Sequence, residues 1–165
     1  FSHNRYFAKT KNMRNLILLI LTATFLSCGA KKLVTSKEKR FEGNWYLEKI
    51  TYNTDANYNV TLFNDASKYC FEGSSWKFLR DNKSGNYVVN KTSCETKVRD
   101  FKYEIGHEDT ATGFYNLILT PINGNTSKSY NLFLKDLDMS SMKWQESRTI
   151  DGVEFTIEMK FKKFD

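Results

Sequence analysis

Few side chains in this sequence could do chemistry. His107, Glu108 and Asp109 are consecutive in "GHEDTATG", and all three residue types can ligate a metal ion. Adjacent residues do not converge easily on one ion, because zinc sites draw their ligands from separated positions, so a solvated turn without metal is favoured. The sequence has no serine nucleophile elbow, glycine-rich phosphate loop or spaced cysteine cluster. We therefore expect neither an enzyme nor a bound cofactor.

Cys28 follows an uncharged apolar run, "LILLILTATFL", over residues 16–26. This run is too short for a membrane-spanning helix, which needs about 20 residues. Met13, the basic Arg14, the apolar run and the small residues after it have the layout of a secretory signal peptide. The end of the run, "FLSC", resembles the lipobox of bacterial lipoproteins. The resemblance implies that Cys28 is acylated, with chains such as palmitate, and becomes the first residue of the mature protein.

The chain therefore divides into four segments. We expect an upstream non-native leader at 1–12, a lipoprotein signal peptide at 13–27, a lipidated tether at 28–40 and a single domain at 41–165. The tether carries the basic stretch "KKLVTSKEKR", which fits either a solvated linker near anionic headgroups or a fraying basic terminus.

The charge of the mature chain does not indicate a nucleic-acid partner. Four of the 25 basic side chains precede residue 28, so 21 basic side chains remain against 19 acidic ones. A nucleic-acid-binding surface needs a concentrated basic face, and only the tether offers a cluster. The expected partner is a membrane, reached through acylated Cys28. Because Gly29 and Ala30 lead into two lysines, without an inner-membrane retention Asp or an acidic export run, we expect the periplasmic face of the outer membrane.

Cys70 and Cys94 are predicted to form a disulfide, since export places them in an oxidising compartment. The segment between them reads as strand, polar turn, strand, with the turn near Lys83 and Gly85 supplying conformational freedom. In an antiparallel hairpin centred there, the two cysteines would lie across the open end. The alternative is a pair of free buried thiols.

Period-two alternation dominates the chain from Trp45 onward. The clearest case is "VEFTIEMKFKK", residues 153–163, with apolar residues on one face and polar residues on the other. The same pattern predicts eight strands, near 44–53, 75–80, 86–91, 98–106, 114–121, 129–136, 142–150 and 152–163. The last two are joined by the tight-turn pair Asp151-Gly152. The long first link, 54–69, is predicted to form a lid or to hold a helical turn.

These elements predict an all-β fold, an eight-stranded antiparallel up-and-down barrel, because closure removes both sheet edges. "GNWYLEKI", residues 43–50, then becomes informative, since Gly-x-Trp opening the first strand resembles the signature of the lipocalins and other calycins. Together with the leader, the chain resembles lipocalin-like lipoproteins of Gram-negative envelopes, in which a strand opening "W-x-F" after a cysteine, here Cys70 with Trp76 and Phe78, is also familiar. The resemblance covers residues 41–164.

The lipocalin resemblance implies a closed base, marked by Gly43 and Trp45, with a basic side chain across the indole. Because the strands run up and down, Arg80 and residues 161–164 reach the same end. Arg80 or Lys162 is therefore expected to cover Trp45 by a cation-π contact and hydrogen bonding. The alternative for Arg80 is an exposed place in a turn.

The mouth is expected at the opposite end, near the lid, the disulfide, the loop "INGNTSKS" and the last hairpin. Strand alternation turns Glu146 and Arg148 inward there, where a charge is costly unless paired. They form either a ligand-orienting pair, or a pair that reaches solvent or follows a register shift. The candidate pocket walls, each also a candidate for plain core, are Phe101, Tyr103, Tyr130, Leu132 and Trp144.

Two functions fit this reading of the sequence. The first is a lipid-anchored periplasmic binding module that holds a small apolar or amphipathic ligand inside the barrel. The second is a structural or assembly lipoprotein that meets an envelope protein through its outer surface, where Tyr46, Ile50 and Tyr52 are expected to crowd one side of the first strand.

Overall fold

The structure is a computed structural model, and it describes residues 36–54, 60–122, 128–150 and 152–164. The expected leader, signal peptide, Cys28 and the first part of the tether lie outside the described residues. Residues 37–165 form one compact unit, so this unit begins four residues before the expected domain boundary at 41.

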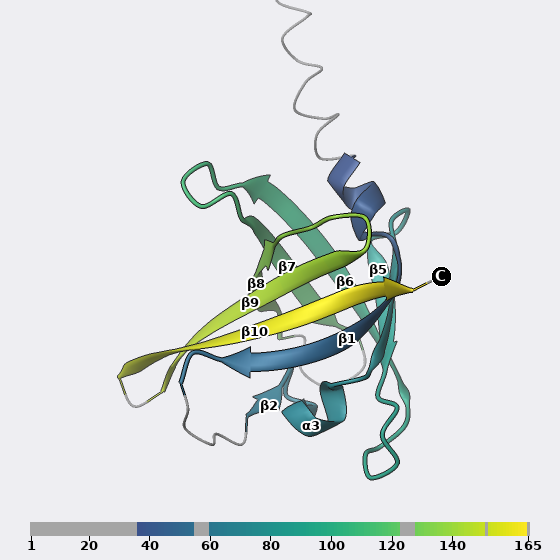
Figure 1. The fold of residues 1–165 in the computed structure, drawn as a ribbon. Coiled ribbons are helices and arrows are strands. Elements are labelled where there is room, and N and C mark those ends of the chain that lie inside the picture. The colour runs from purple at the N-terminus through teal and green to yellow at the C-terminus, as the bar shows by residue number, and fades with distance from the viewer. Residues whose placement is uncertain (1–35, 55–59, 123–127, 151, 165) are drawn as a thin grey trace, which may run out of the picture. The chain divides into compact units, whose positions relative to one another are not determined.

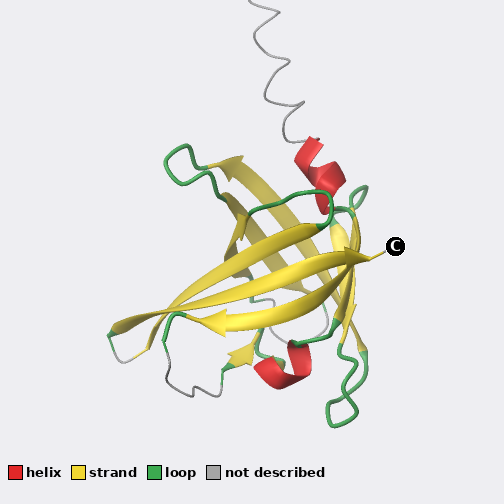
Figure 2. Cartoon of the chain, viewed as in Figure 1, coloured by secondary structure: helices red, strands yellow, loops and turns green. Residues whose placement is uncertain are grey.

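Eight strands close into an antiparallel barrel, as the alternation predicts (Figures 1 and 2). Each strand pairs with its neighbours along the chain, and the first pairs with the last, so the barrel is up-and-down. The strands are β1 (Gly43–Tyr52), β4 (Ser75–Leu79), β5 (Ser84–Val88), β6 (Val98–Glu108), β7 (Tyr115–Pro121), β8 (Tyr130–Lys135), β9 (Ser141–Ile150) and β10 (Val153–Phe164). The all-β, lipocalin-like barrel is therefore confirmed.

The ends of the barrel are covered by short elements. Residues 37–41 are helical and cover the base, where Phe41 is fully buried (Figure 1). The mouth is covered by the small hairpin of β2 (Thr61–Leu62) and β3 (Ala66–Ser67), followed by α3 (Lys68–Phe71). The predicted lid at 54–69 thus contains a hairpin and the start of a helical turn, while its residues 55–59 lie outside the described part.

The predicted disulfide joins Cys70 of α3 to Cys94, which lies in the connection between β5 and β6. The cross-link closes a separation of 24 residues and ties the mouth cover to the connection between β5 and β6. In the chain-entropy model, closing a loop of this length stabilises the fold by about 3.5 kcal/mol.

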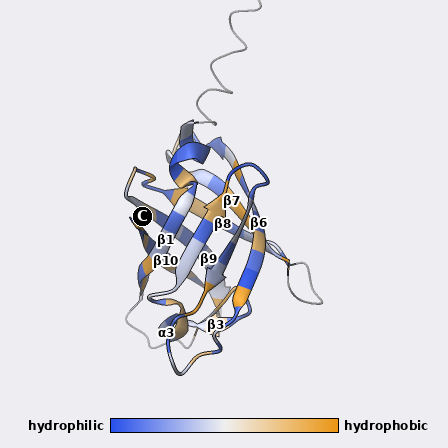
Figure 3. Cartoon of the chain, turned by 90° about the vertical axis from the view of Figure 1, so that its right-hand side faces the viewer, coloured by the Kyte–Doolittle hydropathy of each residue, from blue (hydrophilic) through white to orange (hydrophobic). Residues whose placement is uncertain are grey.

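The interior is filled by the protein's own side chains. Apolar and polar residues alternate along the strands (Figure 3), and the inward-facing set includes three tryptophans that are almost completely buried, Trp45, Trp76 and Trp144. Trp76 is the centre of this packing. Its ring lies within 4.4–6.2 Å, centroid to centroid, of the rings of Phe63, Phe71, Phe78, Tyr87, Phe101, Trp144 and Phe161.

One strand position differs from the alternation expected for β1. The pairing of β1 with β10 slips between Leu47 and Lys49, so Glu48 is an extra, bulged residue. The bulge reverses the parity, and Ile50 points inward and is fully buried. The expected outer cluster of Tyr46, Ile50 and Tyr52 is therefore wrong, because a bulge turns every later side chain of the strand to the opposite face.

Gly85 has a different role from the one expected. The turn is made by residues 80–83, where the Lys83 N–H donates to the Arg80 carbonyl and Lys83 has a φ of 47°. Gly85 lies in β5, so this strand begins two residues before its predicted start at 86. A Cβ at position 85 would lie 2.2 Å from the Lys77 oxygen and 2.5 Å from the Phe101 ring, so glycine is required by close packing.

We predict that Gly85→Ala lowers the free energy of unfolding by about 1–3 kcal/mol, the usual cost of overpacking a core. The matched control is Gly106→Ala in β6, where the nearest atom would lie 3.4 Å away. Urea denaturation of both variants measures the difference. Equal losses in the two variants would show that packing against Phe101 is not the reason for glycine at position 85.

Candidate functional site

The base of the barrel brings the expected glycine and tryptophan together with a lysine. The Trp45 indole N–H donates to the Phe41 carbonyl at 3.0 Å, and the Lys163 ammonium lies 5.1 Å from the indole centroid. Lys163 also donates to the Arg40 carbonyl at 3.0 Å. A Cβ on Gly43 would lie 2.6 Å from Lys163 Cε, and the φ of Gly43 is +123°, so the glycine leaves room for this lysine.

The cation over Trp45 is thus Lys163, and the expectation of Arg80 or Lys162 is wrong. Arg80 lies 3.9 Å from the Glu42 carboxylate, and Lys162 pairs with Glu48. The reason is strand parity. Lys163 lies directly opposite Trp45 and shares the inward parity of β10, whereas Lys162 points outward. The alternation of the last strand already contained this signal.

The mouth is closed by an aromatic side chain on a strained turn. Phe63 and Asn64 both have positive φ, 51° and 53°, and the Asp65 N–H donates to the Leu62 carbonyl. A bulky residue in this region is uncommon and costs about 1–2 kcal/mol. The cost is offset by burial, since the Phe63 ring packs edge-on against Trp76 and Tyr130.

Arg99 ties this hairpin to the barrel wall. Its Nε lies 2.5 Å from the Asp65 carboxylate, and its Nη1 donates to the carbonyls of Glu95 and Lys97. Tyr87 donates its hydroxyl to the same carboxylate at 2.8 Å. Burial, first of all, and the neighbouring carboxylate raise the pKa of Tyr87 well above its ordinary value, so the phenol stays a neutral donor.

Glu146 and Arg148 form a second polar tie at the mouth. Arg148 donates two hydrogen bonds to the Glu146 carboxylate, at 2.7 and 2.9 Å, and a third to the Thr61 carbonyl at 3.1 Å. Glu146 is 8% exposed, whereas 29% of the Arg148 side chain remains accessible. The pairing of β9 with β10 runs without a register shift, so alternation alone turns the pair inward.

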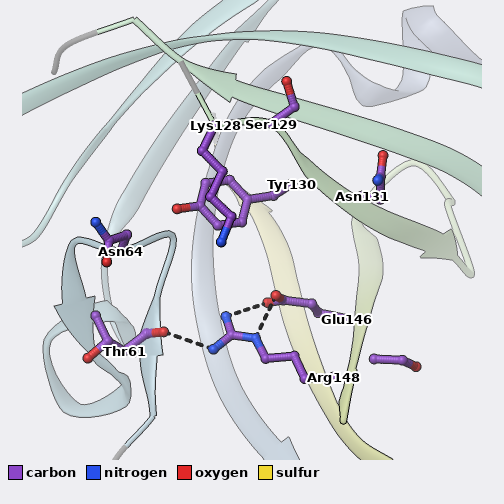
Figure 4. A pocket seen from close by; sticks show the side chains of 9 residues that line it. Thr61, Asn64, Lys128, Ser129, Tyr130, Asn131, Glu146 and Arg148 are labelled. Atoms are coloured by element: carbon purple, nitrogen blue, oxygen red, sulfur yellow. Dashed lines mark hydrogen bonds and ion pairs between the residues drawn. The ribbon is translucent and has the colours of Figure 1, made fainter. Parts of the chain in front are cut away.

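Two cavities open beside these ties. The first, here called the mouth pocket, has a volume of about 260 Å³ and is lined by Phe63, Tyr87, Pro121 and Tyr130 together with Asn64, Asp65, Lys97, Arg99, Asp100 and Lys128. The second, the β8–β9 notch, has a volume of about 390 Å³ and is shown in Figure 4; it is lined by Lys128, Ser129, Tyr130 and Asn131, by Glu146, Ser147 and Arg148, and by Thr61 and Asn64. Asn64, Lys128 and Tyr130 contribute to both cavities.

Of the predicted pocket walls, four residues belong to the buried core and one, Tyr130, lines the mouth. Phe101, Leu132 and Trp144 are fully buried, and Phe101 and Trp144 pack against Trp76. Tyr103 is also buried and donates to the Leu79 carbonyl at 3.3 Å, and burial raises its pKa to about 12. Tyr130 lines the mouth, and its pKa is raised chiefly by burial.

Sequence reasoning missed Arg99, Asp65, Phe63 and Lys128. Arg99 was detectable, because it shares the inward parity of Phe101 in β6. The other three lie in segments without periodicity, where no pattern signals that a side chain turns toward the mouth.

The three adjacent candidates for a metal site lie at the end of β6. Glu108 accepts a short hydrogen bond from the Tyr115 hydroxyl and forms an ion pair with Lys37. The hydrogen bond from Tyr115 lowers the pKa of Glu108. Asp109 accepts the backbone N–H groups of Ala111 and Thr112. Among the described residues, no group of three histidine, cysteine or acidic side chains is arranged to hold a metal ion.

Comparison with known protein families finds no match to this chain, and comparison with curated proteins finds no match either. Within the part of the chain that the structure describes, no helix has the length and apolar character needed to cross a membrane.

We predict that Lys163→Ala destabilises the barrel by about 1 kcal/mol, because it removes a cation-π contact and a hydrogen bond to a carbonyl. Arg80→Ala is the matched control at the same end, and its exposed ion pairs are worth much less. Thermal and urea unfolding of both variants give the comparison. A larger loss for Arg80→Ala would contradict the assignment of Lys163 to the indole.

Proposed function

We propose that this protein is a lipid-anchored periplasmic binding module whose mouth pocket holds a small amphipathic ligand with an anionic end. The observation that carries the proposal is the composition of the mouth pocket, which combines aromatic faces with a surplus of cations. The barrel interior is packed with rings around Trp76, so the pocket geometry favours a ligand at the mouth over one deep in the barrel.

The apolar part of the pocket is formed by Phe63, Tyr87, Tyr130 and Pro121. Aromatic side chains that carry phenol hydroxyl groups are typical of the walls of small-ligand sites. Phe63 and Tyr87 are each 3% exposed, and Tyr130 is 7% exposed, so these walls are held firmly by the core behind them.

The charged part of the pocket favours an anion. Three cationic side chains, Lys97, Arg99 and Lys128, face two acids, Asp65 and Asp100. Arg99 is engaged with Asp65, and Lys97 lies 3.5 Å from Glu95. Among the described residues, Lys128 has no ion pair, and its ammonium lies 5.6 Å from the centroid of the Tyr130 ring, which makes it the candidate to bind a carboxylate or a similar group.

The anchor and the compartment belong to the same proposal. Acylation of Cys28 would hold the barrel at a membrane, and the sorting residues that follow point to the periplasmic face of the outer membrane. The disulfide between Cys70 and Cys94 supports an oxidising compartment.

Binding is tested by isothermal titration calorimetry of the full-length protein in lipid nanodiscs, with phenylbutyrate as the probe. We expect saturable binding that Lys128→Gln weakens about tenfold, because a charge-assisted contact is lost. Lys77→Gln, on the exposed face of β4, is the matched control and should leave binding unchanged. Tighter binding of the cation phenylbutylamine, or loss of binding in both lysine variants, would contradict an anion site at the mouth.

The anchor is tested separately with Cys28→Ala, which removes the acyl-accepting thiol. Wild-type protein should partition into detergent and carry an added diacylglyceryl mass on Cys28, whereas the variant should stay unprocessed or become water-soluble. Protease added to intact cells should leave the domain uncut. Rapid shaving of the domain would instead place it on the outside of the cell.

A further inference from the structure

Strands β8 and β9 separate before either of them ends. Their pairing covers only Lys135 with Lys143, Leu134 with Trp144, and Phe133 with Gln145. Beyond this point β8 continues to Tyr130 and β9 to Ile150, and the β8–β9 notch opens between them (Figure 4). The wall of the barrel is therefore split at the mouth.

The register identifies the main-chain groups that border the notch. The Asn53 N–H donates to the Thr156 carbonyl, so the main-chain groups of Thr156 point toward β1. Because main-chain groups alternate in direction along a strand, those of Phe155 and Ile157 point toward β9. Those neighbours pair with Arg148 and Glu146, whose main-chain groups are thereby directed to β10. By alternation, the N–H and C=O groups of Ser147 and Thr149 point toward the notch.

The opposite rim follows from the same register. The last pair of the ladder joins Phe133 to Gln145. Two residues further along each strand, the same register would pair Asn131 with Ser147, but the ladder ends before this pair. Two strands therefore present main-chain donors and acceptors across a cavity of about 390 Å³. An unpaired strand edge is a template for another extended chain.

Main-chain groups of two other strands, β1 and β10, are capped. The Ile50 N–H of β1 donates to the Glu72 carboxylate at 2.9 Å, and the Leu47 N–H donates to the Ser74 carbonyl. On β10, the side chain of Asn53 accepts the Thr156 N–H and donates to the Glu154 carbonyl. At the β9 edge, in contrast, the Arg148 side chain reaches the Thr61 carbonyl of the lid, and Ser147 and Thr149 have no ladder partner in β8 among the described residues.

We propose that the β8–β9 notch binds an extended peptide segment of a partner protein, which adds as a strand to the free edge of β9. In the bound peptide segment, acidic and apolar side chains alternate. Side chains that point into the mouth are acidic, because they meet Lys128 and the accessible part of Arg148 (Figure 4). Side chains that point outward are apolar, because the outward neighbour at the closed end of the notch is Phe133, which is 44% exposed. The notch shares Asn64, Lys128 and Tyr130 with the mouth pocket, but the peptide proposal rests on the edge of β9 and not on the ligand proposed there.

The test uses the blocked peptide Val-Glu-Val-Glu-Val and the full-length protein in lipid nanodiscs. We expect saturable binding by calorimetry, with slowed hydrogen exchange of the Ser147 and Thr149 N–H groups. Ser147→Pro removes one ladder donor and should weaken binding at least tenfold, while Ser147→Ala keeps the donor and should bind like the wild type. Proline is tolerated at a strand edge, and circular dichroism checks that this variant is folded.

The control peptides keep the proposal open to contradiction even if Ser147→Pro does not fold. A peptide with N-methylated main chain loses its donors and should not bind, and Val-Lys-Val-Lys-Val should bind at least tenfold more weakly. Equal binding of the N-methylated peptide would overturn strand addition. A concentration-dependent dimer that Ser147→Pro abolishes would overturn the peptide partner in favour of a second copy of this chain. Because phenylbutyrate binds the mouth pocket, its affinity should be the same in Ser147→Pro and in the wild type, so failure of one site is distinguishable from failure of the other.

Discussion

The aromatic packing around Trp76 is the constraint on which the rest of the structure depends. The indole contacts rings from the lid, from α3 and from several strands, and its N–H is satisfied by the fully buried Ser74 hydroxyl at 2.8 Å. A small eight-stranded barrel has room for side chains or for one small ligand. Here the side chains occupy the room, so the binding site that we propose lies at the mouth, where the packed rings give way to charged groups.

The lid over the mouth combines a strained turn with a hydrogen bond and an ion pair to the barrel wall. Phe63 adopts an unfavourable backbone conformation, yet its ring completes the aromatic core. Asp65, at the end of the same turn, accepts a hydrogen bond from the Tyr87 hydroxyl and forms an ion pair with Arg99, and the disulfide fixes α3 just beyond. A buried ion pair adds little net stability because desolvation opposes it, and the Arg99–Asp65 pair joins the lid hairpin to β6.

Much of the candidate site follows from strand parity. Glu146 and Arg148 were placed inward by alternation, and the same rule applied to β6 and β10 would have found Arg99 and Lys163. The rule fails where the chain departs from a regular strand. The bulge at Glu48 reversed the direction of Ile50, and the turn after β4 directs Arg80 to the Glu42 carboxylate and not to the Trp45 ring. Phe63 and Lys128 lie outside any periodic segment, so the lid and the loop that carry them were expected at the mouth, but the direction of the two side chains was not.

The sequence by itself determined the all-β class, the number of barrel strands, the up-and-down order and the disulfide, because alternation, short polar links and cysteine spacing are local signals. Only the tertiary structure decided whether the barrel is packed or hollow, since that depends on how side chains from distant strands share one volume. It also decided where the pairing of β8 with β9 ends, because apolar and polar residues alternate along a strand whether or not that strand is paired with a neighbour. The mouth pocket and the β8–β9 notch are therefore products of assembly, built from residues far apart in the chain.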